Sequence, residues 1–477
     1  MTEQLVRTLP EPSLAAESAP KKRGYALALI LTVQLVIVLD MTVVNVALPK
    51  IQTDLDFSAA NLSWVLNAYT LTFGGLLLLG GRIGDVFGRR RAFMVGLSIF
   101  TVASLLGGLA QSSELLVAAR ALQGVGSAIA APSVLALITT MASDDGERNR
   151  GLALFSAVSS AGASLGLILG GVLTGYASWR WSLFINVPIA AVVLVLARRF
   201  IGETARQPGR FDITGALSAT FGSVAIVYGF INAPTHGWTD PRVLGSIAAG
   251  VLSLTIFVIA EGKVRQPLLE LSLLRDRQRA GGIAAMALII GAQFALFFFT
   301  VQFMQHVLGY GALRSGFAYL PLTLLIFATS RFAAGLSTRY GVRPLIATGA
   351  ALLLIANLWL AQLGTDSGYL TELFVPMMLI GVGAGLTFMP LTVAILAGVE
   401  PEHAGTASGV VQMSQQIGGA VGLAVLVTVY ASNDVVGQVV PGMAGSFYTA
   451  AGMFALAIVI TLAFIGRKPR IVGATAH

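Results

Sequence analysis

Apolar residues form long stretches along the chain, and short polar segments separate them. The stretches cover residues 25–48, 62–80, 92–110, 115–139, 151–175, 182–198, 212–232, 243–261, 280–303, 314–333, 343–363, 372–397, 405–430 and 446–466. A helix of about 20 apolar residues, at about 1.5 Å per residue, crosses a hydrocarbon core of about 30 Å. The pattern therefore predicts an all-α membrane protein with fourteen spanning helices.

The composition agrees with this prediction. Of the 477 residues, 56% are hydrophobic and only 11% are charged. Soluble domains carry about 25% charged residues, so a water-soluble fold could not bury this much apolar surface. The absence of cysteine excludes a disulfide framework and a thiolate metal site.

Basic residues indicate how the chain crosses the membrane. With a cytoplasmic N-terminus, only five of the 30 basic residues fall outside the cytoplasmic loops, tails and helix ends, namely Lys50, Arg180, Arg242, Arg314 and the intramembrane Arg120. This bias predicts an inner-membrane protein with both termini in the cytoplasm. The net charge of +8 then reflects topology and leaflet electrostatics, and it gives no support to nucleic-acid binding.

An internal repeat relates the two ends of the chain. Gly124-Val125-Gly126 recurs as Gly381-Val382-Gly383, and the pair Gly162 and Gly166 recurs at nearly the same offset as Gly418 and Gly422. We therefore expect two six-helix bundles, at 25–200 and 266–466, a linker with two additional spans at 201–265, and cytoplasmic tails at 1–24 and 467–477. Many secondary transporters consist of such repeats, with the substrate site near the midplane. Close helix packing alone would also account for each glycine pair.

The loop between the second and third spans combines glycines with charges, at Gly81, Asp85, Gly88, Arg89 and Arg90. An acid at the end of one helix and arginines on the next form a charge clasp that exists in one conformation and breaks in another. In pattern and position this loop resembles the signature loop of the major facilitator superfamily. The resemblance implies a conformational latch, while a simple topology anchor is the alternative. The corresponding loop of the second half, 335–343, has no acid.

Two charged residues are predicted inside the membrane. Asp40 lies about 22 Å along the first span and Arg120 about 8 Å down the antiparallel fourth span, so both reach a similar depth. Intramembrane charges are expensive and indicate function by default. The pair is either a structural strut or a protonation switch; in a switch Asp40 is the carrier, because arginine does not deprotonate.

Further motifs sharpen the resemblance toward the fourteen-span multidrug/proton antiporters (the drug:H+ antiporter-2 branch). The first-helix motif is matched by Asp40, Thr42, Asn45, Ala47, Leu48 and Pro49, and the fourth-helix motif by Arg120, Gln123, Gly124 and Gly126. The fifth-helix antiporter motif is represented by Gly162, Gly166, Gly170 and Gly171, but Leu167 stands where the family usually has proline. The resemblance implies proton-driven export by alternating access, without a cofactor.

Amide and aromatic side chains are the candidates for substrate binding. They are Asn45, Gln123, Gln293, Phe297, Gln412 and Gln416. Ordinary helix packing is the alternative for each of them. No acid lies deep in the last six spans, which favours an apolar neutral or monocationic compound over a dication.

Other function classes find little support. The chain has no phosphate-binding Gly-x-x-x-x-Gly-Lys-Ser/Thr loop, no nucleophile–base pair and no metal-ligand cluster, so we expect neither an ATP-driven pump nor an enzyme. The sequence predicts a monomeric exporter of drugs or antibiotics, with protons and lipid as its other partners. A proton-coupled importer on the same fold is the nearest alternative, and a channel is a more distant one.

Overall fold

The structure is a computed structural model that describes residues 20–58, 61–142, 144–204, 212–264, 275–399, 404–432 and 439–466. All regular elements in these ranges are helical, which confirms the predicted all-α class. The tails 1–19 and 467–477, and parts of the basic loops near 205–211 and 265–274, lie outside the described residues.

The first half of the chain forms seven helices. They are α1 (Pro20–Asp54), α2 (Trp64–Phe87), α3 (Arg89–Gly108), α4 (Ser113–Met141), α5 (Asp145–Tyr176), α6 (Trp181–Phe184) and α7 (Asn186–Phe200), with a 3-10 turn at Asn61–Ser63. The short α6 and α7 together make up the sixth predicted span. Two further helices follow, α8 (Ile213–His236) and α9 (Pro241–Glu261).

The second half repeats this arrangement. Its helices are α11 (Arg277–Gln302), α12 (Ala312–Ala318), α13 (Leu320–Tyr340), α14 (Val342–Leu360), α15 (Phe374–Leu396), α16 (Ala404–Ser432) and α17 (Val439–Phe464), with π-helical turns at Phe303–Val307 and Tyr369–Leu373. In the described part of the chain, thirteen helical stretches are long and apolar enough to cross a membrane. The remaining predicted span, 151–175, lies within α5, whose shorter apolar stretch is Leu165–Tyr176.

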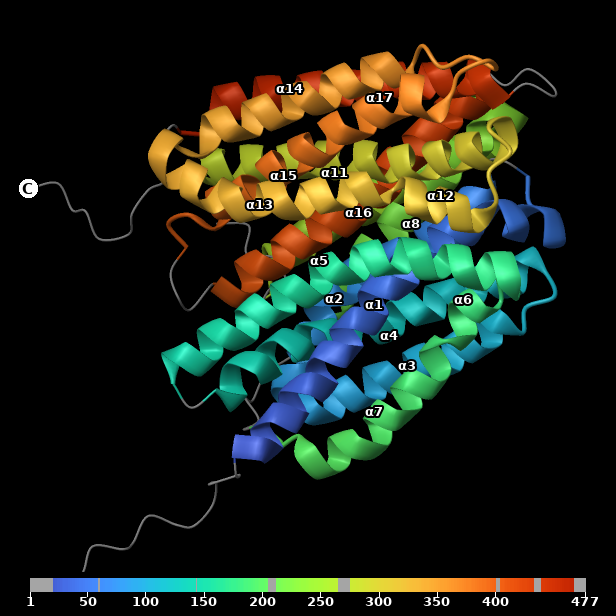
Figure 1. Ribbon diagram of the computed structural model, residues 1–477. Helices are drawn as coiled ribbons and strands as arrows, with labels where there is room; N and C mark the ends of the chain where they lie inside the picture. Colours follow the sequence, from blue (N-terminus) through green and yellow to red (C-terminus); the bar gives the residue numbers. More distant parts are fainter. Residues whose placement is uncertain are drawn as a thin grey trace, which may run out of the picture.

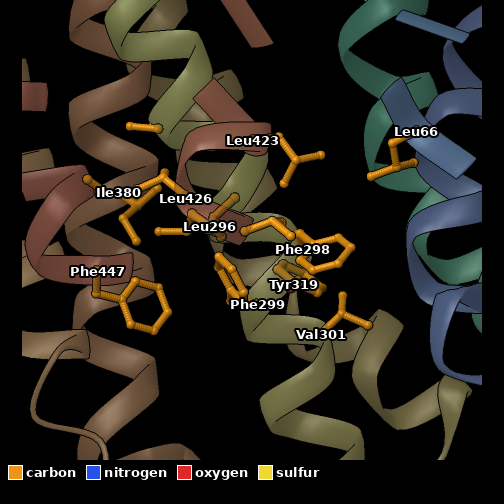
Figure 2. Packing of buried hydrophobic residues seen from close by; sticks show 14 of the residues in the cluster. Leu66, Leu296, Phe298, Phe299, Val301, Tyr319, Ile380, Leu423, Leu426 and Phe447 are labelled. Atoms are coloured by element: carbon orange, nitrogen blue, oxygen red, sulfur yellow. The ribbon is translucent and has the colours of Figure 1, made fainter. Parts of the chain in front are cut away.

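The helices gather into two groups (Figure 1). In one group α1 packs on α5, and α2 and α3 pack on α4. In the other α11 packs on α16 and α17, and α13 and α14 pack on α15. The large hydrophobic core extends from the second group to Leu66 of α2, and in it the Phe299 ring of α11 meets the rings of Phe298 and of Phe447 on α17 edge to face (Figure 2).

The repeated glycines make equivalent contacts in the two groups. A β-carbon on Gly124 of α4 would lie 2.5 Å from the Tyr69 carbonyl oxygen of α2, and one on Gly381 of α15 would lie 2.8 Å from the Leu322 carbonyl oxygen of α13. In the same way, Gly162 of α5 faces α1 and Gly418 of α16 faces α11. Backbones approach this closely only where no side chain intervenes.

The additional helix α8 packs on both groups. It shares an apolar cluster with α2 and α16, formed by Leu71, Val227, Ile231, Ala420 and Ala424. The Thr428 hydroxyl of α16 donates to the Phe230 carbonyl oxygen of α8 at 2.7 Å. The helix α9 packs mainly on α8. The helix α8 therefore covers the boundary where α2 meets α16.

Candidate functional site

Asp40 of α1 and Arg120 of α4 lie in contact, and each residue is only 1% exposed. Nη1 of Arg120 donates to one carboxylate oxygen of Asp40. The other oxygen accepts two hydrogen bonds, from Nε2 of Gln123 at 2.9 Å and from Nδ2 of Asn186 at 2.8 Å. Such a buried carboxylate needs a countercharge and several donors, and Asp40 has both.

The guanidinium of Arg120 is held just as closely. Its Nε donates to the Val65 carbonyl oxygen of α2 at 2.9 Å, and Nη1 also donates to Oε1 of Gln123 at 2.9 Å. The cationic carbon lies 4.5 Å from the centre of the Tyr69 ring, a favourable cation–π distance. The result is a buried pair of net charge zero that ties α1, α2, α4 and α7 together.

Asn186 is a functional candidate that the sequence interpretation did not include. It is the first residue of α7, directly after the break from α6, and it is 1% exposed. An amide inside a predicted span was the only signal in the sequence. The fold alone shows that it reaches Asp40, which lies 146 positions earlier in the chain.

A cavity of about 290 Å³ lies beside the pair, between the two groups of helices. Of the predicted substrate residues, Asn45, Gln293 and Phe297 line it. The wall comes from α1, α2, α4 and α5 on one side and from α11 and α13 on the other. The sequence interpretation placed the cavity among spans 1, 4, 5, 9, 12 and 13; of the corresponding helices, α1, α4, α5 and α11 line this cavity and α15 and α16 do not.

Three predicted substrate residues lie away from this cavity. Gln123 is bound to Asp40, Arg120 and Ser104. Gln412 is exposed on α16, and Gln416 packs its Cβ against Gly74 of α2. A four-residue spacing on one helix indicates a shared face, but not which neighbour that face meets.

Arg120, a member of the pair, and Tyr69, whose ring it contacts, both line the cavity. Near the last turns of α1 the two groups are in direct contact: Nε2 of Gln305 donates to the Val46 carbonyl oxygen at 3.0 Å. A β-carbon on Gly171 of α5 would lie 2.7 Å from the Ala312 carbonyl oxygen of α12. The two groups of helices are therefore in close contact at that end of the molecule.

The loop between α2 and α3 forms a compact charged turn. Asp85 and Arg89 form an ion pair, and Nη1 of Arg89 donates to the Gly81 carbonyl oxygen at 3.1 Å. Gly88 joins the two helices with φ +102°, in the left-handed region that favours glycine. Gly341 joins α13 to α14 in the same way with φ +85°, so the second-half loop keeps the turn without the acid.

Arg90 pairs with Glu203, whereas the loop sequence suggested Asp85 as its partner. Its backbone N–H donates to Oε1 of Glu203 at 3.0 Å, and its Nε lies 3.7 Å from the other oxygen of Glu203. Arg91 lies at the same distance from Glu203. This acid follows α7 in the chain and was not predicted, because the sequence gives no sign that the loop after the sixth span returns to this turn.

Three of the four glycines of the antiporter-type motif pack against the same helix. Positions 162, 166 and 170 face α1, where a β-carbon on Gly170 would lie 2.7 Å from the Val43 carbonyl oxygen. Gly171 instead faces α12 across the boundary between the groups. Leu167 lines the cavity, and its carbonyl oxygen lies against Gly316.

Comparison with known proteins gives a consistent result. The family model described as Major Facilitator Superfamily matches residues 14–423. The chain is 43% identical to "Puromycin resistance protein pur8" of Streptomyces alboniger, over 89% of this chain and 85% of that protein. It is 41% identical to "Cephamycin export protein CmcT" of Amycolatopsis lactamdurans, over 85% of each.

Solved structures share the fold at low identity. A crystal structure of a peptide transporter POT in complex with sulfate superposes with a TM-score of 0.69 and 15% identity, over 92% of this chain and 94% of that one. A chain with this helical architecture and this family match is a transporter and not an enzyme. The protein belongs to the Major Facilitator Superfamily and is a multi-pass membrane protein.

Proposed function

We propose that the protein exports drugs or antibiotics across the cytoplasmic membrane in exchange for protons. The observation that carries this proposal is the fully buried Asp40–Arg120 pair, one member of which also lines the central cavity. The names of the relatives, for puromycin resistance and cephamycin export, support outward transport of antibiotics.

Asp40 is the proposed proton carrier and Arg120 its modulator. A proton on the carboxylate cancels the negative charge and leaves the guanidinium buried without its counterion. An uncompensated buried charge costs several kcal/mol, so the protonated site favours a rearrangement that hydrates Arg120. Because Arg120 is part of the cavity wall, this rearrangement changes the substrate site at the same time.

The loop between α2 and α3 is the proposed cytoplasmic latch. Asp85 with Arg89, and Glu203 with Arg90, tie the ends of α2, α3 and α7 together through charges. These pairs are partly exposed and each is weak by itself, so they can break and reform during a transport cycle. We infer that both termini are cytoplasmic, which places this turn on the cytoplasmic side.

The two six-helix bundles, 25–200 and 266–466, are the proposed moving units. The matching glycine contacts in the two groups support an internal duplication, and the cavity between the groups supports alternating access. Gly162, Gly166 and Gly170 serve as the packing surface of α5 on α1, and Gly171 as the surface on α12.

Purified full-length protein in liposomes tests the function. With an acidic lumen, we expect the wild type to accumulate radiolabelled puromycin as protons leave, beyond the passive trapping of this amine in protein-free liposomes. Asp40→Asn should abolish this accumulation, whereas Asp366→Asn, which changes an exposed acid outside the cavity, should retain it. Reversing the pH gradient separates antiport from symport, because an importer would accumulate drug only with an acidic exterior.

The outcomes assign the roles. Accumulation that persists in Asp40→Asn would make the pair a strut and move the proton site elsewhere. Accumulation under the reversed gradient alone would establish the importer. No accumulation under either gradient would contradict drug export.

A further inference from the structure

The cavity wall carries an unusual charge for an exporter of cationic drugs. Of the described residues that line the cavity, Arg120 alone is charged. Asp40 lies behind Arg120 and is occupied by donors from Arg120, Gln123 and Asn186. A bound molecule therefore meets the guanidinium and not the carboxylate.

Three polar side chains of the wall have hydrogen-bonding groups that the described residues leave unused. The hydrogen bonds of Arg120 engage its Nε and Nη1, and none among the described residues uses Nη2. Asn45 donates through Nδ2 to the Met41 carbonyl oxygen of its own helix, while its Oδ1 is buried and accepts no hydrogen bond from the described residues. Gln293 of α11 presents an amide from the opposite side.

Most of the remaining wall is apolar, and the hydroxyls of the other polar lining residues are hydrogen-bonded to protein groups, at Thr42, Tyr69, Thr70 and Thr323. Leu66, Leu167, Ile290 and Ile326 surround the space, and Phe294 and Phe297 of α11 add aromatic faces. Hydrophobic walls with a few placed polar groups are typical of sites for drug-sized molecules, where the polar groups determine orientation.

We propose that this site selects uncharged, largely aromatic molecules that accept a hydrogen bond from Arg120 and disfavours cations; this inference rests on the proposed export function. An acceptor such as a carbonyl oxygen binds Nη2 without breaking the ion pair. A donor on the ligand binds Oδ1 of Asn45, and the amide of Gln293 completes the site from the second half.

Electrostatics explain the exclusion of charge. A cation gives up its hydration on entering this low-dielectric space and finds no acid on the described wall, and the nearer pole of the net-neutral Asp40–Arg120 pair is the positive one. An anion gives up its hydration and meets a guanidinium that Asp40 already neutralises. When Asp40 takes up a proton, the uncompensated Arg120 makes the site still less favourable for a cation.

Two related dyes test this selectivity. Nile red is uncharged and carries a carbonyl oxygen on the same benzophenoxazine ring system on which Nile blue carries a positively charged amino group. Cells that lack their own exporters and express the full chain are loaded with dye and then energised. We expect Nile red to leave at least about tenfold faster than Nile blue, relative to cells without the protein.

A designed carboxylate provides a gain of function that misfolding cannot imitate. Gln293→Glu places an acid on the cavity wall and should raise the ratio of Nile blue to Nile red efflux by about tenfold. Gln362→Glu makes the same chemical change on an exposed residue away from the cavity and should leave the ratio unchanged.

Each result decides a specific point. Nile blue leaving as fast as Nile red in the wild type, or an unchanged ratio in Gln293→Glu, would overturn the inference. Puromycin accumulation in liposomes without movement of either dye would also overturn it and would leave the export function intact. Failure of both the dyes and puromycin would overturn the proposed function itself.

Discussion

At the scale of single residues, the buried pair is stable only when both charges, on Asp40 and Arg120, are present. Asp40 receives three donors, and Arg120 is held by two carbonyl or amide oxygens, the carboxylate and an aromatic face. Removing one charge leaves the other buried without a partner, and that is far more costly than losing both. The same property makes the pair sensitive to a single proton.

A double-mutant cycle measures this dependence. We expect Asp40→Leu and Arg120→Leu each to destabilise the protein by about 3–5 kcal/mol, and the double variant to be less destabilised than either single variant. Thermal unfolding in detergent measures stability, and puromycin accumulation measures function. If the double variant regains stability but not transport, the pair does more than hold helices together; additive losses would show that the two charges are not coupled.

At the scale of helices, close contacts depend on glycine. Gly170 brings α5 against the backbone of α1, whereas a β-carbon at Gly452 of α17 would meet nothing within 4 Å. Both residues are helical, so they share the same intrinsic preference for alanine. The two glycines differ only in how closely a neighbouring helix packs against them.

Alanine at these two positions should therefore have opposite effects. Gly170→Ala places a methyl group 2.7 Å from the Val43 carbonyl oxygen and should lower the unfolding temperature by several degrees. Gly452→Ala should leave it unchanged or raise it slightly, because alanine favours the helix by about 1 kcal/mol. Equal behaviour of the two variants would contradict the close contact between α1 and α5.

The charged turn after α2 depends on a residue from another helix end. Glu203→Gln keeps an acceptor for the Arg90 backbone N–H but removes the charge that faces Arg90 and Arg91. We expect transport to fall several-fold with a stability change of at most about 1 kcal/mol, since the pairs are partly exposed. Glu147→Gln, on an exposed pair with Arg23, is the control; equal transport in the two variants would remove Glu203 from the latch.

Hydropathy and motif spacing predicted the all-α fold, and the depth estimate predicted that Asp40 and Arg120 lie at a similar depth in the membrane. The contacts of Asn186 and Glu203 were not predictable, since each depends on how α7 lies against α1 and α3. The place of α13 in the cavity wall, where α15 and α16 were expected, was not predictable for the same reason. Periodicity identifies the faces of a helix, but only the packed bundle determines which faces meet.

At the scale of the whole molecule, the proposed orientation predicts which loops face each side of the membrane. The chain has no cysteine, so a single introduced thiol is an unambiguous marker. Thr239, between α8 and α9, is exposed, and a β-carbon added at Gly202, after α7, would meet no neighbouring atom within 4 Å. A membrane-impermeant maleimide should label Thr239→Cys in intact cells and Gly202→Cys only after permeabilisation. The reverse pattern would invert the proposed topology.

The position of α8 has a consequence for the path by which a substrate arrives. Hydrophobic compounds concentrate in the bilayer, and a transporter with two bundles has two lateral boundaries that face lipid. Here α8 packs on both α2 and α16, with α9 behind it, so a protein layer separates that boundary from the acyl chains. The other boundary, where α5 meets α12 and α13, has no additional helix packed over it in the described part of the chain. We therefore expect a compound dissolved in the membrane to approach the cavity from that side, because the two additional helices shield the opposite one.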